Sequence, residues 1–484
     1  MSPPEPASAP LRLFNSLTRG LETFEPVHPG EARVYSCGPT VYNYPHIGNL
    51  RAYVFADVLG RALSWKGYKL THVINITDVG HLTDDADAGE DKLEKAAKER
   101  ARSIWDIARH YTEAFWADVR ALNIRQPSEW SIATQYVPRM IAFAESIADE
   151  HCYTLPSGLY FDVSTVTDYG RLAGHTMEAG EGRIDPVEGK RHPADFAIWR
   201  TTPPGETRQM EWESPWGRGA PGWHLECSVM SEALLGFPFD IHTGGIDHRE
   251  IHHPNEIAQN QAFQRCDHSG ARIWMHNNFL VERSGKMSKS AGEFLRLQLL
   301  IDKGYHPIAY RLMCLQAHYR SELEFSWEGL AAALTRLKRL VMAVEKLRSE
   351  ASPAQLIEDA DLRLMSAAMG AAVANDLNTP ATLTLVEEAI ASRNKSHGEV
   401  LALVLDADSV LGLTLTALTR AELRVRPKSA SIAETDIEAT LARRKEARAA
   451  KDFATSDRLR EELAAQGVEV MDGDPLGWEW KLSA

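Results

Sequence analysis

EARVYSCGPTVYNYPHIGNLRAYVFADVLGRALSWKGYKLTHVINITDVG, residues 31–80, is the stretch that decides the fold. A short apolar run ends at Tyr35, and a second run, at 72–76, repeats the β pattern. Between them, Val54 and Leu59 belong to a set of apolar residues at helical spacing that follows several turn-forming glycines and prolines. Strand, turn, helix and strand make a βαβ unit, which builds parallel sheets with ligand sites at the carboxyl ends of the strands. The sequence therefore predicts an α/β protein.

Length and composition indicate a multidomain, soluble protein. A chain of 484 residues suggests about three or four units, on a prior of roughly one domain per 150 residues. No apolar run approaches the ~20 residues that cross a bilayer, and the start, MSPPEPASAP, has no signal-peptide features. We expect a cytoplasmic protein with no membrane partner. The net charge of −14 excludes a generally basic surface, so any RNA contact must use local basic patches.

The five cysteines do not form a disulfide framework, because they are few, odd in number and widely scattered. Free thiols or metal ligands remain. Cys37 ends the first predicted strand, Cys227 lies in GWHLEC, and His252 and Glu256 lie in HHPNE. Thiol, imidazole and carboxylate are the groups that bind zinc. From these residues alone, Cys37 and Cys227 are more often buried core residues than ligands.

Two short motifs carry the features of a nucleotide site. PHIGN at 45–49 lies between a predicted strand and a helix, where a glycine lets a nucleotide approach and His46 can donate to a phosphate. About 240 residues later, GKMSKS at 285–290 places Lys286 and Lys289 on a glycine-led loop suited to neutralising a triphosphate. Each motif alone is weak evidence, but this pair is hard to obtain by chance.

These are the two signature motifs of class I aminoacyl-tRNA synthetases, and further blocks resemble the cysteine-specific member of that class. The blocks are LRLFNSLTR at 11–19, YSCGPTVYNYPHIGN at 35–49, GWHLECSVMS at 222–231, HNNFLVERSGKMSKSAGEF at 276–294, AHYRSELEFSWEGL at 317–330 and KDFATSDRLREEL at 451–463. The resemblance implies a ligase that activates L-cysteine with ATP and transfers it to the 3′ end of cysteine tRNA, and we expect a monomer. It also implies catalytic roles for His46, Asn49, Lys286 and Lys289.

The resemblance also implies how the domains are arranged. We expect a Rossmann-like catalytic domain that is split by an insertion and followed by a helical bundle and a small α+β anticodon-binding domain. The expected boundaries are 1–122 with 217–266 for the catalytic domain, 123–216 for the insertion, 267–330 for a stem-contact region bearing KMSKS, 331–424 for the bundle and 425–484 for the C-terminal domain.

In cysteinyl-tRNA synthetases the residues matching Cys37, Cys227, His252 and Glu256 bind one zinc ion, and the resemblance implies the same here, with Mg²⁺ accompanying ATP. His253 is then the neighbour that does not bind, although sequence alone cannot separate adjacent histidines. Zinc has a chemical purpose, because serine differs from cysteine by one atom and a shape-selective pocket gains only ~1–3 kcal/mol from so small a change. A thiol, unlike a hydroxyl, loses its proton on the metal and becomes a strong ligand.

The remaining site residues also follow from the resemblance. They are Gly38, Thr77 and Trp223 for cysteine; His46, Asn49, Gly245, Asp247 and Lys289 for ATP; and Arg443, Arg444, Arg448, Trp478 and Trp480 for tRNA. For the last group, a basic helix with two tryptophans suits phosphate contact and base stacking.

The sequence departs from the family pattern in three places. Asn49 stands where the class usually has a second histidine, the segment 248–251 is unusually polar, and Pro254 replaces a commonly acidic residue. Two alternative functions stay open, and these departures bear on the second. One is a cysteine ligase acting on an amino sugar, as in mycothiol synthesis, although those relatives lack the anticodon unit. The other is a degraded paralogue that only binds tRNA.

Overall fold

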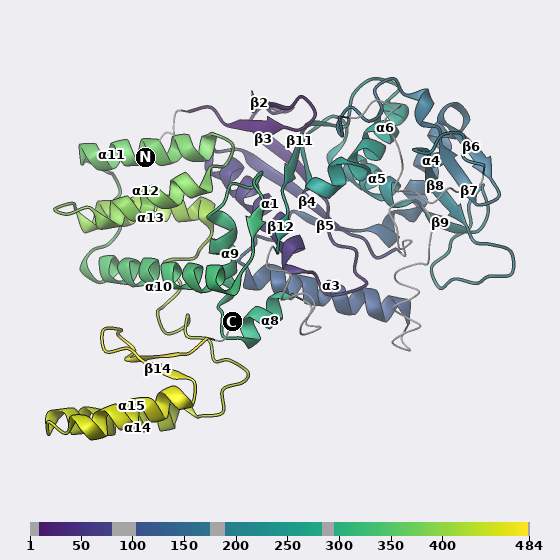
Figure 1. Ribbon diagram of the computed structural model, residues 1–484. Helices are drawn as coiled ribbons and strands as arrows, with labels where there is room; N and C mark the ends of the chain where they lie inside the picture. Colours follow the sequence, from purple (N-terminus) through teal and green to yellow (C-terminus); the bar gives the residue numbers. More distant parts are fainter. Residues whose placement is uncertain (1–8, 80–102, 175–188, 283–294, 483–484) are drawn as a thin grey trace.

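A computed structural model describes residues 9–79, 103–174, 189–282 and 295–482 (Figure 1). Its centre is a five-stranded sheet of order β11-β10-β3-β4-β5, in which every neighbouring pair is parallel. The strands are β3 Glu31–Ser36, β4 Lys69–Ile76, β5 Glu129–Ile132, β10 Phe239–Gly245 and β11 Ala271–Asn277. Helix α1, Ile47–Trp65, connects β3 to β4. The predicted βαβ unit and α/β class are confirmed.

Alternating side chains give each face of the sheet its own core. Val34 and Ile74 pack in the core that also contains residues of α1 and of α3, Ile104–Ala121. Tyr35, which follows Val34, and Val73, which precedes Ile74, pack in the opposite core. Successive side chains on a strand point to opposite faces, so a sheet covered on both sides requires apolar residues at consecutive positions.

The opposite core is formed largely by residues between β5 and β10. A four-stranded antiparallel sheet lies here, in the order β6-β7-β8-β9, together with two helices from this segment and a third helix that follows β10. These elements are α4 Val137–His151, β6 Cys152–Leu155, β7 Gly158–Phe161, β8 Phe196–Thr201, β9 Gly219–Pro221, α5 Trp223–Leu235 and α6 His252–Gln264. Helices α5 and α6 pack against each other and lead the chain back into the parallel sheet.

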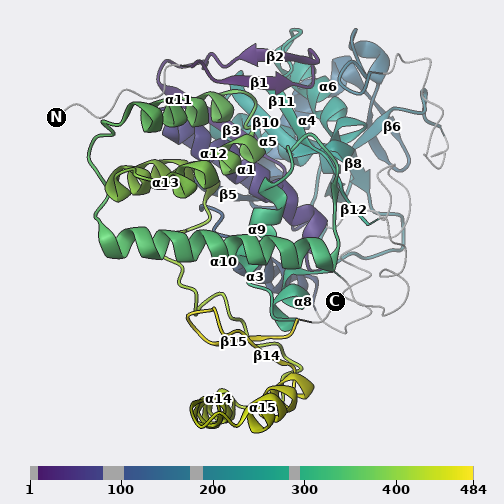
Figure 2. The same ribbon diagram turned by 60° about the vertical axis from the view of Figure 1, so that its left-hand side comes forward.

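The second half of the described chain is mostly helical. The helices are α8 Leu297–Asp302, α9 Pro307–Leu315, α10 Trp327–Glu350, α11 Ala360–Ala374, α12 Thr379–Ala391 and α13 His397–Leu411. The C-terminal unit contains α14 Glu434–Ala449, α15 Phe453–Ala465, β14 Val468–Val470 and β15 Trp478–Trp480. It has its own small core and lies beyond α10 in both views (Figures 1 and 2). The short pairs β1 Arg12–Asn15 with β2 Gly20–Thr23, and β12 Leu280–Val281 with β13 Leu323–Glu324, complete the strands. Within the described residues, no helix has the length and apolar character needed to span a membrane.

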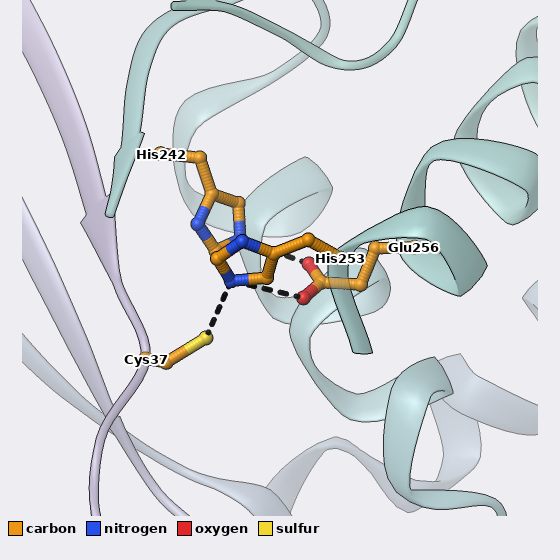
Figure 3. A group of neighbouring side chains, drawn as sticks. All are labelled: Cys37, His242, His253 and Glu256. Carbon is orange, nitrogen blue, oxygen red and sulfur yellow. Dashed lines mark hydrogen bonds and ion pairs between the residues drawn. The ribbon is translucent and has the colours of Figure 1, made fainter. Parts of the chain in front are cut away.

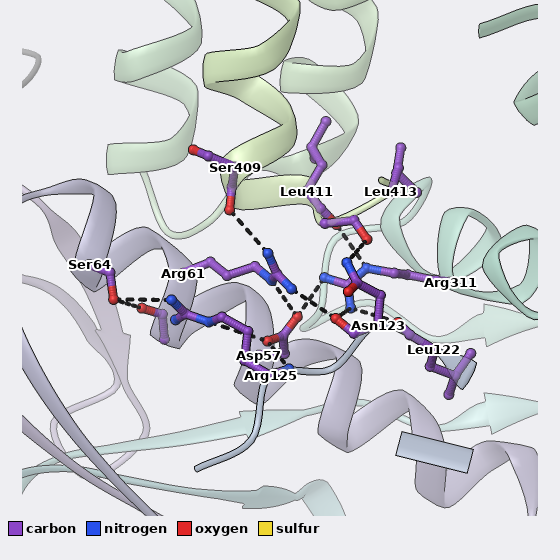
Figure 4. Close-up of polar contacts among 12 residues, drawn as sticks. Asp57, Arg61, Ser64, Leu122, Asn123, Arg125, Arg311, Ser409, Leu411 and Leu413 are labelled. Carbon is purple, nitrogen blue, oxygen red and sulfur yellow. Dashed lines mark hydrogen bonds and ion pairs between the residues drawn. The ribbon is translucent and has the colours of Figure 1, made fainter. Parts of the chain in front are cut away.

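A buried charge network joins the sheet domain to the helices (Figure 4). Asp57 on α1 accepts hydrogen bonds from Arg311 Nη2 on α9 and from Arg61 Nε, both at 2.7 Å. Arg311 also donates from Nε to the carbonyl oxygen of Leu411 at the end of α13, at 2.8 Å. Burial opposes ionisation of Asp57, but the guanidinium groups of Arg311 and Arg61 hold its pKa below the usual value. One carboxylate thus ties three helices together.

Acid should weaken the fold through His72 on β4. This imidazole is buried, its Nε2 lies 2.8 Å from Ser36 Oγ, and burial lowers its pKa to about 4. In the unfolded chain the pKa is about 6.5, so between these values the unfolded state binds more protons and stability rises with pH. We expect the free energy of unfolding of the wild type, minus that of His72→Gln, to fall by about 3 kcal/mol as pH drops from 6.5 to 4. Urea titrations across that range measure this difference, and a constant difference would contradict the assignment.

Candidate metal and nucleotide site

The site lies at the carboxyl ends of β3 and β10, which are neighbours in the sheet. Cys37 directly follows β3, and Gly245 ends β10 next to Asp247. These residues line one cavity of about 590 Å³ together with His46 and Trp223. The structure therefore brings residues from three distant parts of the sequence to one edge, as the rule for parallel sheets predicts.

The four expected metal ligands converge at the base of this site. The donor atoms of Cys37, Cys227, His252 and Glu256 all lie within 4.8 Å of one another. His252 and Glu256 are four residues apart on α6, so they share one face, and His252 Nε2 lies 3.1 Å from Glu256 Oε1. Cys227 comes from the neighbouring helix α5. The structure thus builds a compact donor cluster from one strand end and two packed helices.

Two of the four groups, the Cys227 thiol and the Glu256 carboxyl, have lowered pKa values. A hydrogen bond with Cys37 lowers the pKa of the buried Cys227 thiol to about 6. Burial opposes ionisation of Glu256, but His242 and His252 lower its pKa to about 2. Its Oε1 is fully buried and has no well-aligned hydrogen-bond donor among the described residues. Two thiols, an imidazole and a carboxylate fit the ligand preferences of zinc.

Neighbouring histidines orient the donors. His224 Nδ1 lies 2.9 Å from His252 Nδ1, which leaves Nε2 of His252 directed at the cluster. His242 Nε2 lies 2.9 Å from Glu256 Oε2. Such contacts fix the tautomer and the direction of metal-binding groups. His224 and His242 were not predicted from the sequence. The available signal was the histidine within GWHLEC and the histidine in the otherwise apolar strand FPFDIH.

The first motif forms a reciprocal helix cap at the cavity wall. His46 is the N-cap of α1, and its Nδ1 accepts a hydrogen bond from Gly48 N at 3.0 Å. Asn49 Oδ1 in turn accepts from His46 N at 3.1 Å. Burial lowers the pKa of His46, so the ring is neutral near pH 7 and carries its proton on Nε2. This part of the cap requires only a hydrogen-bond acceptor at position 49, and the Asn49 side chain provides one.

Of the residues expected to bind cysteine, some line the cavity and one is buried away from it. Trp223 lines the cavity, and its ring centroid lies 4.3 Å from that of His252. A Cβ on Gly38 would come within 1.5 Å of the Asn75 carbonyl oxygen, so glycine is required for this close approach. Thr77 is buried and donates to Glu226 Oε2 at 3.1 Å, and it is not among the described residues that line the cavity.

The polar segment after β10 forms a short 3-10 helix, Ile246–Arg249. His248 lines the cavity, with Nδ1 3.5 Å from Asp247 Oδ1. A Cβ on Gly245 would come within 2.2 Å of that carboxylate oxygen, so any other residue there requires the Asp247 side chain to move. Lys286 and Lys289 lie outside the described residues.

The tryptophans of the C-terminal unit correct one expectation. Trp478 and Trp480 are 0% and 2% exposed and form an edge-to-face pair at 5.0 Å, so neither ring can stack on a base in this structure. They build the small core of the unit instead. Arg444 is also buried and makes two hydrogen bonds to Asp472. Arg443 and Arg448 remain exposed.

Known proteins share this architecture. Two solved structures of Mycobacterium tuberculosis methionyl-tRNA synthetase with methionyl-adenylate superimpose with TM-scores of 0.51 and 0.52, at 16% and 15% identity, covering 82% of this chain and 92% of theirs. The family described as the class I (C) tRNA synthetase catalytic domain matches residues 23–335. Fold and site therefore define a class I aminoacyl-tRNA synthetase.

The particular family follows from closer relatives. The cysteine–tRNA ligase of Novosphingobium aromaticivorans is 72% identical over 482 residues, 98% of each chain. That of Zymomonas mobilis is 55% identical over 98% of each chain. The cysteinyl-tRNA ligase anticodon binding domain matches residues 434–475. The chain belongs to the cysteinyl-tRNA ligase family.

Proposed function

We propose that the cluster of Cys37, Cys227, His252 and Glu256 holds the zinc ion through which this ligase selects cysteine. The chain is an aminoacyl-tRNA synthetase that uses ATP to join cysteine to tRNA. The observation that carries the proposal is the convergence of the four donor atoms within 4.8 Å, beside a cavity lined by Cys37 and Trp223. When bound, zinc supplies a Lewis acid that takes the substrate as a thiolate and binds the serine hydroxyl poorly.

The residues around the cluster hold and enclose the amino acid. Trp223 stands between the cavity and His252, where it excludes water and limits the size of the side chain. Glu256 is the ligand that we expect to adapt, since a carboxylate can bind through one oxygen or two. His242 Nε2, 2.9 Å from Glu256 Oε2, limits that movement.

Activation needs positioning and charge stabilisation rather than a nucleophilic side chain. The cysteine carboxylate attacks the α-phosphorus of ATP, forming cysteinyl-adenylate and releasing pyrophosphate. The neutral His46 ring donates from Nε2 toward the phosphates at the N-terminus of α1, whose dipole favours negative charge. Asp247 is placed to accept from the ribose hydroxyls, and Lys286 and Lys289, with Mg²⁺, neutralise the pyrophosphate as it leaves.

Transfer to tRNA requires the C-terminal unit. We assign phosphate contacts to the exposed Arg443 and Arg448 on α14, and leave the two buried tryptophans to the core. The family match over residues 434–475 supports this role and argues against an amino-sugar ligase, because those enzymes lack the unit.

Cysteine-dependent exchange between ATP and pyrophosphate, followed by charging of cysteine tRNA, tests the proposal. We expect exchange with cysteine to exceed exchange with serine by about 10⁴-fold or more, the range reached when a wrong substrate leaves a site's binding group unsatisfied. Metal analysis of the same sample should give one zinc per chain. Exchange without charging would instead favour a cysteine ligase that acts on an amino sugar. Binding of tRNA without exchange would favour a degraded paralogue.

A further inference from the structure

Figure 3 shows a second set of four possible metal donors, which shares two residues with the first set. Cys37, His242, His253 and Glu256 also present one donor atom each, all within 4.8 Å of one another. Cys37 and Glu256 belong to both sets. The two sets therefore differ only in one pair, Cys227 with His252 in the first and His242 with His253 in the second.

The donor separations of the second set are close to those of a tetrahedral metal site. His253 Nε2 lies 3.3 Å from Cys37 Sγ and 3.9 Å from Glu256 Oε1. His242 Nε2 lies 2.9 Å from Glu256 Oε2. A tetrahedral zinc, with nitrogen and oxygen at about 2.0 Å and sulfur at about 2.3 Å, separates its donors by roughly 3.3 to 3.8 Å. Small side-chain movements bring the second set into that range.

The surroundings of His253 resemble those of a metal-binding imidazole. Its Nδ1 lies 2.8 Å from His276 Nε2, and His276 Nδ1 lies 2.8 Å from Ser16 Oγ. If Nδ1 donates into this buried chain, Nε2 keeps a lone pair directed at Cys37 and Glu256. An outer hydrogen bond of this kind sets the tautomer and raises the basicity of a ligand.

The two positions differ in depth. The first is next to Trp223, which lines the substrate cavity and whose ring centroid is 4.3 Å from that of His252. The second is next to Trp274, which is 0% exposed and whose ring centroid lies 4.5 Å from that of His242 and 5.0 Å from that of His253. A metal in the second position is withdrawn from the cavity toward the core.

We propose that the metal has two alternative positions, and that Cys37, His242, His253 and Glu256 form the inner one. The proposal extends the metal site proposed above. The shared ligands restrict the site to one ion at a time, so the stoichiometry stays at one per chain. The outer position offers two thiolates and faces the substrate, whereas the inner position offers one thiolate and two imidazoles and holds the ion when an outer ligand is lost.

Cobalt(II) binding to the metal-free full-length chain tests this, because the intensity of the thiolate-to-cobalt charge-transfer band counts bound thiolates. We expect the wild type and His253→Gln to bind one cobalt with two thiolates. Cys227→Ser should still bind one cobalt, with about half the band intensity. The double variant Cys227→Ser/His253→Gln should bind at least about 100-fold more weakly than Cys227→Ser, since a remaining ligand has been removed. Circular dichroism of each variant checks that it is folded.

The variant His252→Gln tests for the inner position while both cysteines are still present. A metal in the inner position gives half the wild-type band intensity in this variant, whereas a metal that stays in the outer position keeps the full intensity. Three results would refute the inner position. The first is that folded Cys227→Ser binds no cobalt, and the second is that the double variant binds cobalt as tightly as Cys227→Ser. The third is that cobalt bound to His252→Gln keeps both thiolates. Failure of the wild type itself to bind metal would overturn the proposed zinc site as well.

Discussion

Cys37→Ser is expected to remove the metal and to lower cysteine-dependent exchange by at least about 10³-fold, which corresponds to about 4 kcal/mol of transition-state stabilisation. Cys37 belongs to both donor sets, so its loss leaves neither position with four ligands. A serine hydroxyl is a poor substitute for a thiolate on zinc. Metal analysis and the exchange assay measure the two effects on one sample.

Cys266→Ser is the matched control for this experiment. Cys266 is exposed and is in neither donor set, so the same chemical change should leave zinc content and exchange at wild-type levels. Full zinc content and full exchange in Cys37→Ser would contradict the metal site. Because Cys37 is only partly buried at the cavity wall, the variant should fold.

Asp57→Ala is expected to destabilise the protein by about 3–5 kcal/mol, the usual cost of leaving a buried charge without its partner. Arg311, which is 0% exposed, loses the carboxylate that balances its charge, and Arg61 loses the same partner. Urea denaturation measures the change in the free energy of unfolding. The effect is large because the network ties α1, α9 and α13 together.

Asp106→Ala supplies the comparison. Asp106 pairs with Arg109 within α3, and both side chains are more than half exposed. An exposed pair contributes about 0.2–1 kcal/mol, so this variant should stay close to the wild type. Equal losses in the two variants would show that the buried network has no special role in stability.

The local pattern predicted the centre of the fold well. The βαβ unit of 31–80 appears as β3, α1 and β4, because alternation and helical spacing are local features that tertiary contacts here reinforce. The same pattern placed Cys37 and His46 between the end of the first strand and the start of the helix, whereas Asp247 was predicted from the resemblance to a family. Resemblance to a family added Cys227, His252 and Glu256, which spacing alone could not have joined.

Residues whose role depends on a partner far along the chain were harder to predict. The local sequence around Trp478 and Trp480 does not show whether their side chains face the solvent or a core. The packing of β15 with α14 and α15 shows that both are buried. His242 was missed because its partner, Glu256, is on another element.

The sequence by itself determined the α/β class, the two nucleotide motifs and the types of donor atom available, because these depend on local periodicity and on side-chain chemistry. Only the tertiary structure decided how those donors are grouped. His252 and His253 are adjacent in the chain, and each reaches Glu256, at 3.1 and 3.9 Å. Their rings point into different surroundings, toward Trp223 and Trp274, because neighbouring residues on a helix face about 100° apart. That rotation separates the two metal positions that we propose, one facing the cavity and one toward the core.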